Sequence, residues 1–252
     1  MAASINSSPV HREPDLIGQT VLVIGGSAGI GLETARLARA QGAGIILTAR
    51  NPDRLHRAGL ELGASIAAFD ATDFGRLERF FGALPAPIDH LLVTGPGPCY
   101  APLAGFDLDA ARRLVDARLL LPLQVARDAA AKIRPGGTLL FMGGTGGRRT
   151  VAGRSFIAAL TAALAALTKS LALEVAPVRV NLIAAGFVDT PLSSSLLGDR
   201  IDERRAQLRA TLPIGRVVGP ADIAALAIHL MTNTAITGAT FDIDGGQQLL
   251  EG

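Results

Sequence analysis

Several residue types are scarce or missing in this sequence, and each absence narrows what the protein can be. The 252-residue chain has no tryptophan, one tyrosine and one cysteine, Cys99. A single cysteine excludes an intramolecular disulfide and a cysteine-rich metal site, so no metal is expected, and it favours a cytoplasmic location. The longest nearly apolar run, residues 156–167, is too short to span a bilayer, so no membrane association is expected.

An excess of one charge is also missing. The 24 Lys and Arg residues nearly balance 22 Asp and Glu residues, and no dense basic block is present, so no nucleic acid partner is expected. Hydrophobic residues make up 49% of the chain and charged residues 18%, which indicates a sizeable buried core. We expect residues 1–15 to form a flexible tail and residues 16–252 to form one domain.

Short apolar strands alternate with helices along the whole chain. Strands are predicted at residues 20–24, 44–48, 65–69, 88–94, 138–142, 178–183 and 239–243. Helices are predicted at residues 29–41, 52–62, 73–82, 109–133, 154–175 and 221–231. This alternation predicts an α/β fold, in which a doubly wound parallel sheet of about seven strands (a Rossmann fold) carries helices on both faces.

A glycine-rich turn joins the first predicted strand to the first helix. Glycines here allow a tight turn and a close approach of the backbone to a pyrophosphate, whose charge the following helix favours. A tight turn that binds no ligand is the alternative, but the flanking strand and helix favour a dinucleotide site. The turn residues predicted to contact the cofactor are Gly25, Ser27, Ala28, Gly29, Ile30 and Gly31.

The second predicted strand ends in Arg50 and Asn51, without an acidic residue to bind the ribose hydroxyls of NAD. Arg50 can instead pair with a 2′-phosphate, and Ser27 adds a hydroxyl donor, so NADP(H) is predicted over NAD(H). A solvated surface role is the alternative for Arg50. Asp70, followed by Ala71, is predicted to accept a hydrogen bond from the adenine amine, with helix capping as its alternative.

From about residue 18 to residue 246 the chain resembles the short-chain dehydrogenase/reductase family. Residues 171–181 resemble the stretch after the family's catalytic helix, residues 186–191 the loop that touches the nicotinamide, and residues 242–246 the exit from the last strand. The resemblance implies an oxidoreductase with a substrate lid at about residues 192–212. It also implies cofactor contacts at Gly95, Pro96, Gly186, Val188 and Thr190.

The family's catalytic residues are missing at the matching positions. Family members use a Tyr-x-x-x-Lys pair, a Ser and an Asn. Alignment places Ile157 and Thr161 at the Tyr and Lys positions, Gly144 at the Ser position and Arg118 at the Asn position. Isoleucine has no proton to transfer, so the catalytic residues stay unknown. Two functions remain open: an atypical oxidoreductase on a carbonyl or alcohol substrate, or a catalytically inactive NADP(H)-binding sensor or partner subunit.

Other polar side chains are candidates for the missing chemistry. Thr145 can orient a carbonyl, and the permanently charged Arg118 can donate to an oxyanion. The alternative for Arg118 is a buried ion pair with Asp116 or Asp189. Tyr100 is a candidate acid, with loop packing as its alternative.

Further expectations concern the rim of the cleft and the assembly. Arg148, Arg149 and Arg154 are expected at the rim, where they can attract an anionic substrate, whereas His90 is expected to lie too far from the reaction site. The resemblance implies a homodimer or homotetramer packed through helices 109–133 and 154–175. Burial of these helices within one subunit is the alternative.

Overall fold

Seven parallel strands form one sheet in the order β3-β2-β1-β4-β5-β6-β7. The computed structural model describes residues 15–85, 87–98, 100, 102–148 and 151–250, so nearly all of the predicted tail lies outside the described residues. The strands are β1 (Thr20–Ile24), β2 (Gly44–Ala49), β3 (Ser65–Ala68), β4 (Ile88–Val93), β5 (Ile133–Gly144), β6 (Arg179–Ala185) and β7 (Thr240–Ile243). The predicted doubly wound sheet is confirmed, and the strand order reverses between β1 and β4, where such folds bind ligands.

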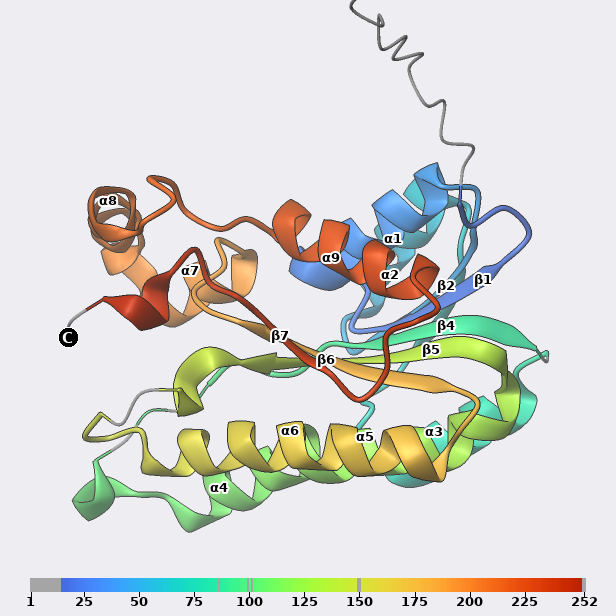
Figure 1. The fold of residues 1–252 in the computed structure, drawn as a ribbon, viewed down its shortest axis with the longest axis horizontal. Helices are drawn as coiled ribbons and strands as arrows, with labels where there is room; N and C mark the ends of the chain where they lie inside the picture. The colour runs from blue at the N-terminus through green and yellow to red at the C-terminus, as the bar shows by residue number, and fades with distance from the viewer. Residues whose placement is uncertain (1–14, 86, 99, 101, 149–150, 251–252) are drawn as a thin grey trace, which may run out of the picture.

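Helices cover both faces of the sheet (Figure 1). One face carries α1 (Gly29–Ala40), α2 (Pro52–Leu62) and α9 (Pro220–Thr232). The other carries α3 (Phe74–Ala83), α4 (Leu108–Val115), α5 (Leu121–Ala129) and α6 (Ser155–Glu174). Two short helices, α7 (Pro191–Leu197) and α8 (Ile201–Thr211), follow β6 and lie beyond the carboxyl end of the sheet.

The central strands are buried on both faces, which explains their continuous apolar runs. In β4, Leu91 packs into the core under α3, α5 and α6, whereas the next residue, Leu92, packs into the core under α1 and α9. The same alternation places Leu139 and Leu140 of β5 in opposite cores. Each fully buried leucine contributes roughly 1.5–3 kcal/mol, so the sheet is a rigid platform for the loops at its ends.

The predicted long helix over residues 109–133 is present from Leu108 to Lys132, but it is not a regular α-helix throughout. A π-helical turn at Asp116–Leu120 separates α4 from α5, because Pro122 has no N–H to donate to the carbonyl four residues earlier. The strand β5 also begins at Ile133, before the predicted start at residue 138. Ile133 pairs with Ile88, and Thr138 then pairs with His90, so the intervening residues form a bulge.

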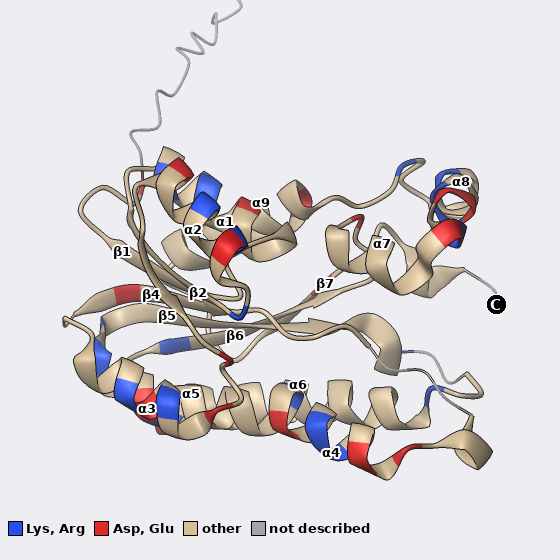
Figure 2. Ribbon diagram, turned by 180° about the vertical axis from the view of Figure 1, so that it is seen from behind, with Lys and Arg blue, Asp and Glu red and all other residues tan. Residues whose placement is uncertain are grey.

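The segment after β6 contains two helices that were not predicted from its polar sequence. Thr190 caps α7 by accepting a hydrogen bond from the Ser193 N–H, and Pro191 occupies the first turn. The following α8 carries side chains of both charge signs (Figure 2). In the described part of the chain, α6 is the one helix long and apolar enough to cross a membrane, but its residues Leu160 and Leu164 are buried inside the folded chain.

Candidate functional site

The glycine turn between β1 and α1 is tied tightly to the neighbouring strands. The N–H groups of Gly25 and Gly26 both donate to the Thr48 carbonyl at the end of β2, at 2.8 and 3.1 Å. Gly25 has a φ of +89°, and a Cβ there would lie 1.9 Å from the Oγ1 atom of Thr94. The turn therefore accepts only glycine at this point, independent of any ligand.

The first turn of α1 is suited to an anion. Ala28 stands at the N-cap and offers no side-chain cap, and the first turn contains no acidic residue. The backbone N–H groups of a helix start otherwise need a side-chain acceptor or water, and with the helix dipole they favour a phosphate group. The residues present thus fit the pyrophosphate of a dinucleotide cofactor.

The predicted nicotinamide loop comes directly beside the glycine turn. A Cβ on Gly29 would lie 3.5 Å from both Cβ and Cγ2 of Thr190. Backbone contacts hold this loop in place. The Gly186 N–H donates to the Ile243 carbonyl at 3.1 Å, and Val188 forms a β-bridge with Val218. Two predicted cofactor segments, about 160 residues apart in sequence, therefore meet at the carboxyl end of the sheet.

At the end of β2 the side chain of Arg50 extends into solvent, with 76% of its surface exposed and its Nη1 atom 4.0 Å from Asp70 Oδ2. Asp70 Oδ1 accepts hydrogen bonds from both the N–H and the hydroxyl of Thr72 in a local turn, whereas Asp73, not Asp70, caps α3. Asn51 likewise caps α2 through the Arg54 N–H. The exposed guanidinium of Arg50, at the end of β2, is therefore available to bind an anion.

Gly144, Ile157 and Thr161, which are predicted from the sequence at the family's Ser, Tyr and Lys positions, lie near one another at the start of α6 and the end of β5. A Cβ on Gly144 would lie 3.9 Å from Thr161 Cγ2, and one on Gly146 would lie 4.0 Å from Ile157 Cγ2. Ile157 is 3% exposed. The Thr161 hydroxyl donates to the Ala158 carbonyl at 2.9 Å. The buried side chain of Ile157 in this cluster carries no group that could donate a proton.

Arg118 projects from the π-helical turn toward the loop after β4. Its Nη2 donates to the Pro96 carbonyl, and its Nε atom is buried without a partner among the described residues. Burial lowers the pKa of Arg118, and the nearby Tyr100 partly offsets this. The alternative of an ion pair with Asp189 is wrong, because Asp189 pairs with Arg205 at 2.8 Å. The described residues give Arg118 no acidic partner at all.

The rim residues divide into paired and unpaired cations. Arg148 forms an ion pair with Asp242 at 2.7 Å, so the expected anion-attracting role does not suit it. The guanidinium carbon of Arg154 lies 5.1 Å from the centre of the Tyr100 ring, beside the loop after β4. Arg149 and Cys99, also considered from the sequence, lie outside the described residues.

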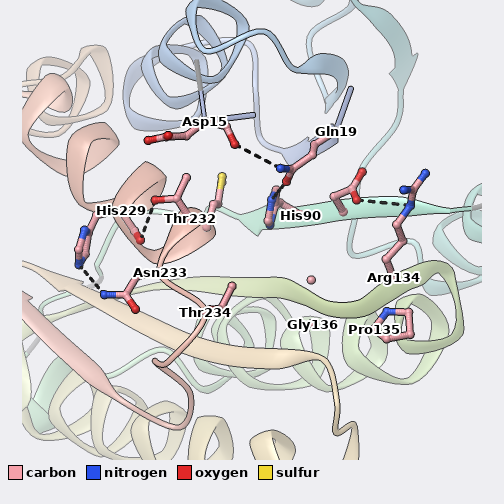
Figure 3. Close-up of a pocket in the computed structure, with 13 residues that line it drawn as sticks. Asp15, Gln19, His90, Arg134, Pro135, Gly136, His229, Thr232, Asn233 and Thr234 are labelled. Atoms are coloured by element: carbon pink, nitrogen blue, oxygen red, sulfur yellow. Dashed lines mark hydrogen bonds and ion pairs between the residues drawn. The ribbon is translucent and has the colours of Figure 1, made fainter. Parts of the chain in front are cut away.

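His90 lies at the opposite, amino-terminal edge of the sheet, as expected. It lines a cavity of about 650 Å³ together with Asp15, Arg134 and His229, and Figure 3 shows these residues around the cavity. Its Nε2 atom lies 2.6 Å from the Gln19 amide oxygen, while Nδ1 is buried without a described partner. Burial lowers the pKa of His90 to about 4. His90 therefore takes no part in chemistry at the glycine turn.

Comparisons with known proteins agree with this geometry. Residues 25–248 match the family model described as enoyl-(acyl carrier protein) reductase. The short-chain dehydrogenase/reductase ATR9 of Stachybotrys chlorohalonatus is 29% identical, over 92% of this chain and 98% of that protein. The chain belongs to the short-chain dehydrogenase/reductase family of oxidoreductases.

Solved structures show the same likeness. The MalC reductase/Diels-Alderase of Malbranchea aurantiaca superposes with a TM-score of 0.86 at 27% identity, covering 95% of this chain and 100% of that one. BdcA in complex with NADPH superposes with a TM-score of 0.82 at 26% identity, covering 92% and 95%. The fold, the uncapped helix start and the family together support the binding of a nicotinamide cofactor.

Proposed function

We propose that this chain is an NADP(H)-dependent oxidoreductase that interconverts a carbonyl and an alcohol without the family's Tyr–Lys pair. The observation that carries the proposal is the close approach of Gly29 to Thr190, which joins the phosphate turn to the nicotinamide loop. The NADPH complex of BdcA supports the same cofactor for a related fold.

The preference for NADP(H) over NAD(H) is proposed from the end of β2. Arg50 is exposed and long enough to reach a 2′-phosphate, and Ser27 lies in the glycine turn that joins β1 to α1. An acidic residue, which would repel that phosphate, is missing at this position. We propose the remaining predicted contacts for the same cofactor: Gly25, Ala28, Gly29, Ile30, Gly31, Asn51, Asp70, Ala71, Gly95, Pro96, Gly186, Val188 and Thr190.

The bound nicotinamide supplies or accepts the hydride. Arg118 then stabilises the negative charge on the substrate oxygen, because its guanidinium stays charged. This electrostatic stabilisation is stronger in a site that contains little water. Thr145, at the carboxyl end of β5, is proposed to orient the same oxygen. Water or the Tyr100 hydroxyl delivers the proton to the alkoxide. Without a positioned acid the rate is expected to be roughly 10²–10⁴-fold below that of a complete tetrad.

Stopped-flow mixing tests this proposal. Full-length protein at high concentration is loaded with NADPH and mixed with a panel of ketones, aldehydes and enones, while NADPH absorbance and fluorescence are recorded. We expect NADPH to bind and to be oxidised with at least one carbonyl class. Tight binding with no oxidation across the panel would contradict the oxidoreductase and leave a binding protein. Tighter binding of NADH would contradict the cofactor preference.

The lid, the assembly and the location are proposed on separate grounds. Residues 192–212 form α7 and α8 beyond the sheet, and we propose that they close over the substrate. Leu173 on α6 is 83% exposed and Leu123 on α5 is half-exposed, which supports a homodimer or homotetramer through this face. Light scattering that gives a monomer mass at micromolar concentration would contradict it. A cytoplasmic location is proposed from the single cysteine.

A further inference from the structure

Three arginines from distant parts of the chain converge on Tyr100 at the carboxyl end of the sheet. The guanidinium carbon of Arg154 lies 5.1 Å from the centre of the Tyr100 ring. Arg118 is close enough for Tyr100 to influence its pKa. The charge of Arg154 lowers the pKa of Arg204 on α8, and Tyr100 raises it. The guanidinium carbon of Arg204 lies 5.9 Å from the centre of the Phe187 ring in the nicotinamide loop. The cluster therefore lies between the lid, the loop after β4 and the proposed cofactor.

The three side chains have no acidic partner among the residues that the structure describes. The next residue along α8 shows the contrast, because Arg205 forms ion pairs with both Asp189 and Asp202 at 2.8 Å. Arg204 instead donates to the amide oxygen of Gln207, at 2.7 Å. Arg118 and Arg204 are half-buried and Arg154 is exposed, and like charges near one another repel unless an anion compensates them.

A guanidinium that lies over an aromatic ring can still donate hydrogen bonds, as Arg204 does to Gln207. A guanidinium carries its five N–H groups in its own plane, so stacking on an aromatic ring uses the face and leaves the edge for a carboxylate. Burial lowers the pKa of Arg204, and repulsion from Arg154 acts in the same direction. An anion between these two residues would relieve that repulsion.

The start of α6 adds an independent attraction for an anion. This 20-residue helix begins directly after Arg154, with no side-chain cap and no acidic residue in its first turn. The positive end of its dipole therefore points into the same region as the arginine edges.

We propose that Arg154 and Arg204 bind a carboxylate on the substrate while Arg118 faces the reacting oxygen, so that the protein acts on small oxo acids and hydroxy acids. This inference builds on the proposed oxidoreductase function and names its substrate class. In the reduction, the hydride adds to the carbonyl carbon, a proton from water adds to the oxygen, and the carboxylate is unchanged. NADPH is oxidised to NADP⁺ in the same step.

Calorimetry with matched probes tests the carboxylate site without turnover. The full chain, saturated with NADP⁺, is titrated with 4-oxopentanoate and with 4-acetylbenzoate, and with the methyl ester of each. We expect each acid to bind at least about 10-fold more tightly than its ester, and the advantage to shrink as salt is raised. Equal affinities for acid and ester, or no binding of either acid, would overturn the proposal.

Variants locate the effect. In Arg154→Gln combined with Arg204→Gln, the preference for the acid is expected to fall to about twofold or less. Arg209→Gln removes the same charge from an exposed position of α8 and is expected to keep the preference. If Arg209→Gln lost as much of the preference for the acid, the preference would come from long-range electrostatics, which would contradict a carboxylate site at Arg154 and Arg204. A parallel loss of NADP⁺ affinity in the double variant would assign the arginines to the cofactor and also contradict it.

NADPH oxidation, measured on the same probes, separates this inference from the proposed function. Acid binding without NADPH oxidation would keep the carboxylate site and contradict the oxidoreductase. Oxidation with equal kcat/KM for acid and ester would keep the oxidoreductase and overturn the carboxylate site.

Discussion

The carbonyl oxygen of Gly25 closes over the Cα atom of Gly31, so that a Cβ at position 31 would lie 2.3 Å from that oxygen. The same Cβ would lie 3.0 Å from the Gly25 carbonyl carbon. Both neighbours are backbone atoms and cannot move away as a side-chain end can. The turn and the first turn of α1 therefore form one rigid unit whose shape depends on glycine at position 31.

Gly31→Ala is expected to open this turn. Overpacking of this kind costs about 1–3 kcal/mol, and the displaced N–H groups of α1 should weaken NADPH binding at least about 10-fold. Chemical unfolding and fluorescence titration measure the two effects. The control is Gly82→Ala in α3, where a Cβ would meet nothing within 4 Å and stability should stay or rise slightly. Unchanged NADPH affinity in Gly31→Ala would contradict the assignment of the turn.

Arg50→Gln is expected to weaken NADPH binding about 10-fold or more and to leave NADH binding within about twofold. The reason is that only the 2′-phosphate interacts with this exposed guanidinium. Arg54→Gln, in the first turn of α2 and also exposed, removes the same charge and should change neither affinity. Competition titrations with both cofactors give the comparison. An equal loss of NADH affinity in Arg50→Gln would contradict the assignment of Arg50 to the 2′-phosphate.

The periodic part of the fold could be predicted from the sequence, because strands such as β1 and helices such as α2 form from local pattern and burial. The break at Asp116–Leu120 could have been suspected from Pro122, but a single proline inside a long apolar repeat did not determine which hydrogen bonds would shift. The early start of β5 could not be predicted, since Pro135 and the following glycines indicate a turn and the strand pairing is a long-range property.

The cofactor half of the site could likewise be predicted from the sequence, because it depends on glycines whose spacing reflects local backbone geometry. The substrate half was not. Arg204 and Tyr100 are about 100 residues apart, and their proximity arises from the position of α8 beyond the carboxyl end of the sheet (Figure 1). The sequence offered Arg118 and Arg154 as separate candidates, but no local pattern indicated that Arg204 would join them.

Arg118→Gln is expected to lower kcat/KM about 10²-fold, because it removes the donor to the substrate oxygen, and to leave NADPH affinity unchanged. Stability should change little, because the loss of the hydrogen bond to the Pro96 carbonyl is offset by removal of a buried Nε atom without a described partner. Arg113→Gln removes an exposed charge from the neighbouring α4 and should keep full activity. A fall in melting temperature that parallels the fall in activity would indicate a structural role instead.

Asp189→Asn is expected to loosen the attachment of α8. Arg205 donates to both carboxylate oxygens of Asp189, at 2.8 and 2.9 Å, and such a two-point pair at the surface is worth about 1 kcal/mol. Hydrogen exchange in residues 191–211 should accelerate about fivefold. Asp202 pairs with the same arginine but is 84% exposed, so Asp202→Asn should have a much smaller effect. Equal acceleration of hydrogen exchange in both variants would contradict a specific role of Asp189 in attaching α8.

His90 is expected to make the fold sensitive to acid. Burial, opposed by Asp89 and reinforced by Arg179, holds the pKa of His90 at about 4, against 6.5 for a free histidine. The unfolded chain therefore binds more protons between these values, so stability is complete above pH 6.5 and declines as pH falls toward 4. One histidine contributes about 3 kcal/mol over this window. Urea unfolding from pH 7 to pH 4 should show this decline, reduced in His90→Gln and unchanged in His56→Gln, whose side chain is exposed on α2. A decline of the same size in His90→Gln would assign the acid sensitivity to other groups.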